Sequence, residues 1–232
     1  MPDENEDLST PLDEAPVSAH EAAHGGEACG IAAITRPVPV KRDKPAIDPR
    51  TVALDRDDAL LFVIDVQEKL CAAMDARAVE ALTKNIQVLI RAAHRLGLPV
   101  IASEQYRKGL GPTLPAIAEL LREPAFDKLE FSAGNNEALA RAVLQTKRRQ
   151  VLVVGMETHI CIFQTARDLT RAGFATFVLE DAVLSRTEAN RQLGLSLCER
   201  AGATRTGTEA VVFDLLGQAG TEEFRALARE FR

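Results

Sequence analysis

Cysteine is scarce in this 232-residue chain, and its spacing fits neither a zinc site nor a disulfide framework. The four cysteines stand at positions 29, 71, 161 and 198, and no two of them form a C-x-x-C pair. Thiolate zinc sites need such closely spaced pairs, and disulfide-rich domains carry more cysteines in a shorter chain. Free cysteines are typical of a reducing compartment, so we expect a cytoplasmic protein.

Long hydrophobic runs are also absent. No stretch of the sequence approaches the roughly 20 apolar residues that cross a bilayer. The N-terminus lacks the basic patch and the hydrophobic core of a signal peptide. We therefore expect a soluble protein that is neither exported nor bound to a membrane.

An excess of positive charge is missing as well. The formal net charge is −6, and residues 1–50 supply −5 of it with ten acidic and five basic residues. The rest of the chain is nearly neutral, which gives no electrostatic attraction for nucleic acid or for an anionic membrane. The expected partner is a small-molecule substrate.

The first fifty residues contain no aromatic residue and are rich in proline, alanine, glycine and acidic residues. This composition cannot bury enough apolar surface to offset the entropy of ordering, so it predicts a disordered acidic leader over residues 1–50 and a folded domain over 51–232. The leader contains "HEAAH", which matches the zinc-protease pattern H-E-x-x-H with His20 and His24 as ligands and Glu21 as base. The flanking residues offer no apolar helix face and no third ligand, so we do not assign a protease site to this motif.

From residue 58 onward, short apolar runs alternate with segments of helical periodicity. This alternation favours parallel strands joined by helices that cover both faces of a sheet. The sequence therefore predicts an α/β fold with an open, doubly wound, mainly parallel six-stranded sheet in a Rossmann-like three-layer arrangement. The expected strands are 59–65, 97–103, 126–132, 150–155, 175–181 and 203–207. The expected helices are a long one with an apolar face from Val79 to Leu96, followed by 114–121, 137–145, 160–172 and 188–200.

Ligands of such sheets bind beyond the carboxyl ends of the strands, so the residues that follow each strand are the first candidates for a site. Asp65 follows the first strand, with Gln67 close behind and no G-x-G-x-x-G motif, so we expect no dinucleotide and no other cofactor. Asp65 is either a backbone cap or a site residue. Lys128, in the third strand, is either a solvated lysine or an inward one that needs an anionic partner.

Cys161 follows the fourth strand, which ends at Gly155. The next helix is expected to begin near Thr158, a residue type that favours the N-cap position. Cys161 would then lie in the first helical turn, where the free N–H groups and the helix dipole favour a thiolate and can hold an oxyanion. A small buried hydrophobe is the alternative reading of this cysteine.

A nucleophilic Cys161 would need a base. His94 lies near the middle of the long helix, with no sign that it faces the ends of the strands. His159 is two residues from Cys161, a spacing at which helical side chains do not face each other. Asp65 is therefore the better candidate for the base.

Five segments of the chain follow one another in order, namely "FVIDVQEKL", "PVIASEQYRKGLG", "KLEFSA", "VVGMETHICIFQTARDL" and "VLEDAVLSR". In this order and with this spacing they resemble the isochorismatase-like cysteine hydrolases. The resemblance runs from about residue 58 to 216 or beyond, and among subgroups it is strongest to the isochorismatase domain-containing proteins.

This resemblance implies a catalytic triad of Asp65, Lys128 and Cys161. It also implies a cis peptide bond between Met156 and Glu157, and an oxyanion hole formed by the backbone N–H groups of Glu157 and Cys161. The implied chemistry is hydrolysis of a small C–N substrate of the amide or carbamoyl type through a thioester. True isochorismatases cleave a vinyl ether and lack the cysteine, so the presence of Cys161 argues against that reaction.

Candidate pocket residues are Gln67, Tyr106, Phe131 and Thr158. Nicotinamidases of this family hold a metal through histidines after the second strand, whereas "SEQYRKGLG" at 103–111 has none. We therefore expect no metal. The resemblance also implies a homo-oligomer, a dimer or larger. The alternative to a hydrolase is a non-catalytic interaction module or a thiol sensor on the same fold.

Overall fold

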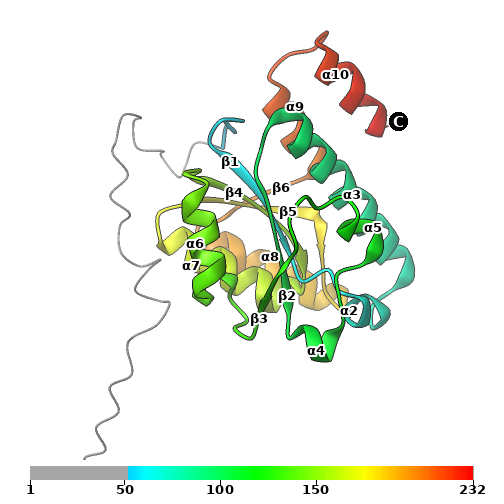
Figure 1. The fold of residues 1–232 in the computed structure, drawn as a ribbon, viewed down its shortest axis with the longest axis vertical. Helices are drawn as coiled ribbons and strands as arrows, with labels where there is room; N and C mark the ends of the chain where they lie inside the picture. Colours follow the sequence, from blue (N-terminus) through cyan, green and yellow to red (C-terminus); the bar gives the residue numbers. More distant parts are fainter. Residues whose placement is uncertain (1–51, 232) are drawn as a thin grey trace, which may run out of the picture.

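The computed structural model describes residues 52–231. The expected leader, with its "HEAAH" motif, lies outside the described residues. Six parallel strands form one sheet in the order β3-β2-β1-β4-β5-β6 (Figure 1), which confirms the α/β prediction. The strands are β1 Ala59–Ile64, β2 Val100–Gln105, β3 Phe126–Lys128, β4 Gln150–Met156, β5 Ala175–Leu184 and β6 Thr204–Thr206.

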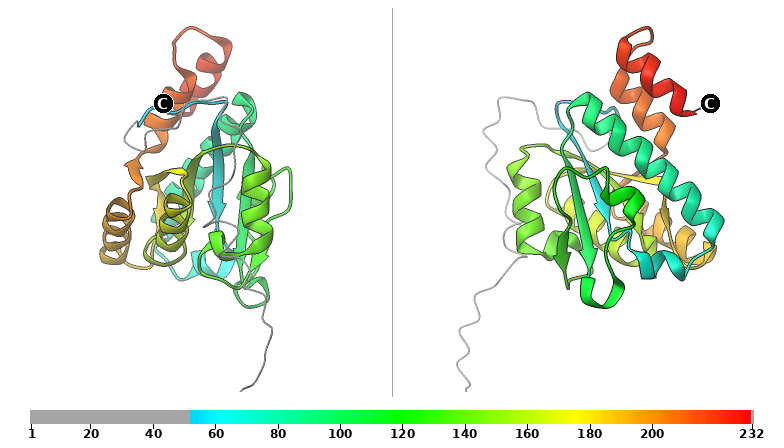
Figure 2. Two further views of the ribbon diagram at one scale, coloured as in Figure 1. Left: turned by 90° about the vertical axis from the view of Figure 1, so that its left-hand side faces the viewer. Right: turned by 45° about the vertical axis from the view of Figure 1, so that its right-hand side comes forward.

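Helices cover both faces of this sheet, and Figure 2 shows α3 along one face with α6 and α7 on the other. The helices on the side of α3 are α2 Glu68–Ala72, α3 Ala76–Leu96, α4 Arg107–Leu110, α5 Pro115–Ala118, α9 Thr208–Leu216, α10 Glu222–Leu227 and the 3₁₀ helix η3 Ala228–Phe231. The helices on the side of α6 and α7 are the 3₁₀ helix η1 Ala133–Asn135, α6 Glu137–Gln145, the π-helical turn η2 Thr158–Ile162, α7 Phe163–Arg171 and α8 Glu188–Arg200. Among the described helices, none is long and apolar enough to cross a membrane.

The central strand β1 shows how the apolar sequence builds two cores. All six of its residues are buried, as expected for a strand with helices on both faces. Leu61 and Val63 belong to the core on the side of α3 and α9, whereas Leu60 and Phe62 belong to the core on the side of α6, α7 and α8. Alternate side chains of a strand point to opposite faces, so one continuous apolar run supplies both layers.

Local signals set the ends of α3. The Asp75 side chain accepts a hydrogen bond from the Ala78 N–H and caps the first turn. Gly97 has φ 78° and ends the helix in the left-handed conformation. The apolar residues from Val79 to Leu96 face the first core, as their 3.6-residue spacing predicts.

β3 and β5 end three or more residues from their predicted ends, and β2 begins three residues later than its predicted range 97–103. β3 ends at Lys128, because the next residues fold around its ammonium group, which donates to the carbonyl oxygens of Glu130 and Phe131. β5 continues to Leu184, because its pairing with β4 resumes after a register shift between Val153 and Gly155. Neither the early end of β3 nor the extension of β5 can be predicted from the residues next to the strand ends.

Candidate active site

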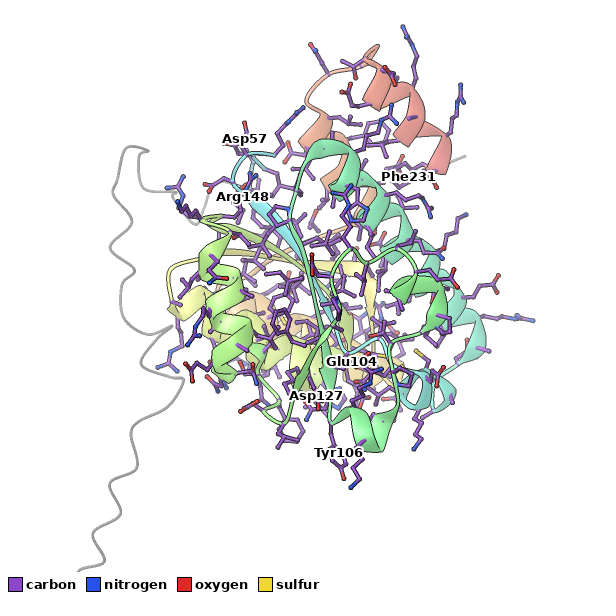
Figure 3. The ribbon with its side chains drawn as sticks, viewed as in Figure 1. Asp57, Glu104, Tyr106, Asp127, Arg148 and Phe231 are labelled. Carbon is purple, nitrogen blue, oxygen red and sulfur yellow. The ribbon has the colours of Figure 1, made fainter. Side chains whose placement is uncertain are left out.

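The candidate site lies at the edge of the sheet where the parallel strands end. In Figure 3 this edge carries the labelled residues Glu104, Tyr106 and Asp127, whereas the opposite edge carries Asp57 and Arg148. The strand order places β1 between β2 and β4, so the connections from β1 and β3 leave in opposite directions along the sheet. A crevice is expected where the strand order reverses.

Asp65 is the first residue after β1, and it is fully buried. Its φ is 54°, in the left-handed region that aspartate tolerates better than most residues. Its N–H donates to the Ser103 carbonyl at 3.0 Å, and its Oδ1 accepts from Ser103 Oγ at 2.8 Å. The other oxygen, Oδ2, accepts from Lys128 Nζ at 2.7 Å. The carboxylate is therefore fixed on both sides.

Lys128 ends β3 with its side chain fully enclosed. Its ammonium group donates to Asp65 Oδ2 and, at 2.6 Å, to Gln105 Oε1. The carbonyl oxygens of Glu130 and Phe131 lie at 3.2 and 3.4 Å. A buried ammonium group is tolerated only with this kind of pairing. The structure thus gives Lys128 the inward orientation that the sequence left open.

Cys161 lies in η2, directly after β4, and is 6% exposed. After burial, the charge of the Asp65 carboxylate and a hydrogen bond with it are among the causes that raise the pKa of the Cys161 thiol. Asp65, Lys128 and Cys161 therefore lie in one buried cluster, although 96 residues separate the first from the last in the sequence. The peptide bond between Met156 and Glu157 is cis.

The turn that carries Cys161 differs from the expected helix start. It is a π-helical turn, with Glu157 in the N-cap position and no side-chain cap. Thr158 is the first residue of the turn, and its N–H donates to Ser185 Oγ at 3.1 Å. The Glu157 carboxylate accepts from the backbone N–H and the Nε of Arg186, both at 3.1 Å. Residues from the end of β5 therefore anchor the turn in place of the expected threonine cap.

The electrostatics of Cys161 also differ from the expected thiolate. The pKa of its thiol is raised to about 12, first by burial and then by the charge of Asp65, with Lys128 opposing. Burial likewise raises the pKa of the Asp65 carboxyl, against the charge and hydrogen bond of Lys128. Burial is the largest cause of both shifts, and it favours the protonated thiol of Cys161 beside the Asp65–Lys128 pair.

Two glycines allow the close packing around this site. A Cβ on Gly155, which has φ 116°, would lie 1.9 Å from the Ile64 carbonyl oxygen. A Cβ on Gly194, in α8, would lie 2.5 Å from both the His159 nitrogen and the Thr158 carbonyl carbon. The backbone of η2 therefore rests directly on α8.

The four predicted pocket residues differ in their exposure. Gln67 is fully buried, and its amide is occupied by backbone groups: it accepts from the Gln105 N–H and donates to the carbonyls of Gln105 and Gly111. Thr158 is also fully buried. Tyr106 and Phe131 are 49% and 55% exposed, so their rings lie at the surface.

The sequence analysis did not single out two polar residues that bond to Asp65 and Lys128, namely Ser103 and Gln105. Both lie near the end of β2 and are buried, at 1% and 9% exposure. The available signal was a polar "SEQ" directly after the apolar "VIA" of a buried strand, because buried polar side chains need partners. Within residues 52–231, no group of three or more His, Cys, Asp or Glu side chains is arranged to hold a metal ion.

Comparisons with known proteins show the family and the fold of the chain. The chain is 33% identical over 174 residues to isochorismatase domain-containing protein 2 of Bos taurus, covering 74% of this chain and 81% of the relative. It is similar to the structure of MAR1 ribonuclease from Caenorhabditis elegans, with a TM-score of 0.71, 34% identity, and 77% and 92% of the two chains covered. It also has the fold of the Escherichia coli YcaC product, an octameric hydrolase of unknown specificity, with a TM-score of 0.72, 24% identity, and 81% and 92% covered. The isochorismatase domain model matches residues 59–210, and the chain belongs to the isochorismatase family.

Proposed function

We propose that the protein is a cysteine-dependent hydrolase of small C–N substrates, of the amide or carbamoyl type, that works through a thioester. The observation that carries this proposal is the buried contact of Cys161 with the Asp65–Lys128 pair. A scaffold gains little from a buried ion pair, since an apolar pair of similar volume is often as stable. Acyl transfer, by contrast, needs a nucleophile, a base beside it and a fixed countercharge.

The first step begins from the protonated thiol. Asp65 accepts the proton of Cys161 as the sulfur attacks the substrate carbonyl, because a thiol with a pKa of about 12 does not ionise by itself at neutral pH. Lys128 keeps its charge throughout and holds the Asp65 carboxylate toward the sulfur. The tetrahedral intermediate then collapses, the C–N bond breaks, and the amine leaves with the proton that Asp65 returns.

We assign the oxyanion of this intermediate to the backbone N–H groups of Glu157 and Cys161. The N–H of Thr158, which lies between them, already donates to Ser185 Oγ. Oxyanion holes gain their effect from donors that are fixed before the reaction. The contacts of Arg186 with the Glu157 carboxylate and of Ser185 with Thr158 supply that rigidity.

Hydrolysis of the thioester completes the cycle. Asp65, ionised again, takes a proton from water; the hydroxide oxygen forms the new C–O bond, and the thiolate leaves and recovers the proton. No metal or cofactor is required in this scheme. Among the pocket residues, we propose that Tyr106 and Phe131 contact the substrate from the rim, whereas Gln67 and Thr158 shape the floor of the pocket.

We also propose a cytoplasmic homo-oligomer. Tyr106, Leu129 and Phe131 are large apolar residues that are 49–70% exposed, next in sequence to Gln105 or within three residues of Lys128. A second subunit packed nearby would remove this apolar surface from water. The octameric state named for the E. coli structure supports assembly of the same fold.

Cleavage of RNA is the second candidate, because the C. elegans structure is named a ribonuclease. Thiol sensing is less well supported, because a buried thiol with a pKa of about 12 is slow to oxidise. The two hydrolytic readings differ in one respect: RNA cleavage has no need of a thiol nucleophile, whereas the proposed amide chemistry cannot proceed without Cys161.

The test is ammonia release from a panel of primary amides and N-carbamoyl compounds, with single-stranded RNA as a parallel substrate. We expect at least one small amide to turn over, and we expect Cys161→Ala to reduce that turnover to background. Cys198→Ala is the matched control, because Cys198 is also buried, in α8, but neither Asp65 nor Lys128 is among the causes of its raised pKa. Amide hydrolysis that survives in Cys161→Ala, or RNA cleavage without any amide turnover, would overturn the proposal.

A further inference from the structure

The side chain of Gln105 makes a contact that the proposed mechanism does not use. Gln105 is the last residue of β2, and its Oε1 accepts a hydrogen bond from Lys128 Nζ at 2.6 Å. This distance is as short as the 2.7 Å contact between Lys128 and Asp65. Hydrogen bonds from a charged donor are the strong ones, so Gln105 is the second main partner of the ammonium group.

The amide of Gln105 has one allowed orientation. Its Nε2 donates to the Leu129 carbonyl at 2.8 Å, while its Oε1 faces the ammonium group of Lys128. A flipped amide would place two donors against each other at Lys128 and two acceptors against each other at Leu129. The contacts themselves therefore fix the oxygen on Lys128.

The backbone of Gln105 is held as firmly as its side chain. Its N–H donates to Gln67 Oε1 at 2.7 Å, and its carbonyl accepts from Gln67 Nε2 at 3.1 Å. The Gln67 amide also donates to the Gly111 carbonyl at 2.6 Å. A chain of hydrogen bonds thus connects the segment after α4 to Lys128 and, through it, to Asp65.

The charges that face Lys128 come from several elements. Asp65 is its ion-pair partner, at the end of β1. Glu130 lies in the segment after β3, and its carboxyl accepts a hydrogen bond from Asn136. That hydrogen bond and the charge of Lys128 both lower the pKa of the Glu130 carboxyl. Cys161 lies beside the pair in η2, and the charge of Glu157, whose carboxylate is paired with Arg186, acts on the Cys161 thiol.

We propose that Gln105 is a positioning residue whose neutral amide holds the Lys128 ammonium group against Asp65 and leaves Asp65 as the only carboxylate bound directly to it. The inference rests on the proposed function, because it assigns a role within the same triad. An amide and a carboxylate have nearly the same shape, so the choice of glutamine sets the charge of the site and not its geometry. A carboxylate at this position would compete with Asp65 for one ammonium group, and one of the two acids would then retain a proton.

The test is Gln105→Glu in the full chain, with two readouts. The first is the pH dependence of Cys161 alkylation by iodoacetamide, which requires no substrate. The second is the pH dependence of kcat/KM on whichever amide turns over. We expect both profiles to move to higher pH by at least about one unit, because an added carboxylate raises the pKa of its acidic neighbours by about that much or more. Gln87→Glu is the matched control, because Gln87 lies on α3 and donates only to the Ala116 carbonyl.

Gln105→Met supplies a variant without the added charge, should the glutamate variant fail to fold. It removes the acceptor of Lys128, and we expect kcat to fall about ten-fold or more, with KM nearly unchanged and the profiles in place. Profiles that stay in place in Gln105→Glu, or a Gln105→Met enzyme with wild-type kcat, would overturn the inference. The proposed function fails by a different result, hydrolysis that persists in Cys161→Ala.

Discussion

Replacing Asp65 with asparagine should raise the chemical reactivity of Cys161 while it abolishes hydrolysis. The carboxylate has two opposite effects in the structure. It is the base of the proposed reaction, yet its charge is the second largest cause, after burial, of the raised pKa of the thiol. Asp65→Asn removes the charge and keeps the shape, so the two effects become visible separately. Lys128 then has the Cys161 thiolate as its nearest available anion.

The magnitude follows from the contact. A charge within about 4–6 Å shifts a pKa by roughly 1–3 units, so the thiol pKa should fall from about 12 to roughly 9–11. At a pH near 8 the thiolate fraction then rises about 10- to 1000-fold. A less basic thiolate is also a weaker nucleophile, with a Brønsted slope near 0.4–0.5, which leaves a net gain of about 3- to 60-fold in alkylation rate.

The assay is alkylation by iodoacetamide, followed by peptide mapping so that Cys161 is separated from Cys71 and Cys198. Those two thiols report the unchanged background, since neither has Asp65 among the causes of its raised pKa. In the same variant, hydrolysis should fall by about 10²- to 10⁴-fold, because the base is gone. An alkylation rate that stays constant or falls would refute the assigned coupling between Asp65 and Cys161.

Three further predictions follow from the same contacts. Lys128→Met leaves the Asp65 carboxylate buried without its cationic partner, so the free energy of unfolding from urea denaturation should fall by about 3–5 kcal/mol; a loss below 1 kcal/mol would contradict the buried pair. Gly194→Ala forces α8 away from η2 and should cost about 1–3 kcal/mol and lower kcat, whereas Gly207→Ala, where the nearest atoms lie at 3.7 Å, should do neither. The acidic limb of the kcat/KM profile should lie above the ordinary aspartate pKa of about 3.9, because burial raises the pKa of Asp65; a limb below that value would exclude Asp65 as the base.

Most of the fold could be predicted from the sequence because its signals are local. Each buried strand is an apolar run of the right length, and α3 has a 21-residue amphipathic pattern between Asp75 and Gly97. The end of β3 at Lys128 and the extension of β5 to Leu184 could not be predicted in this way. The end of β3 depends on the contacts of the Lys128 ammonium group, which include Asp65 and Gln105 from other strands. The end of β5 depends on its pairing register with β4.

The candidate site also has a part that local sequence predicts and a part that depends on distant contacts. Asp65 was proposed because the residue after a buried strand stands at the ligand-binding edge of a parallel sheet, and Cys161 because it lies at the start of the helical segment after the fourth strand. Ser103 and Gln105 contact side chains from other strands, Asp65 and Lys128, and local sequence does not indicate these contacts. The protonation of Cys161 likewise depends on burial and on Asp65, which is distant in the sequence. The local sequence indicated a helix start and a thiolate, whereas burial beside Asp65 decides in favour of the thiol.

The most direct test of the central claim is the capture of the covalent intermediate. The full chain is mixed with an amide that it hydrolyses, quenched in acid, digested and analysed by mass spectrometry. The proposed chemistry predicts an acyl group on the peptide that contains Cys161, lost on treatment with hydroxylamine as expected for a thioester, and absent in Cys161→Ala. Turnover with no acyl group on Cys161, or the same turnover in Cys161→Ala, would contradict it.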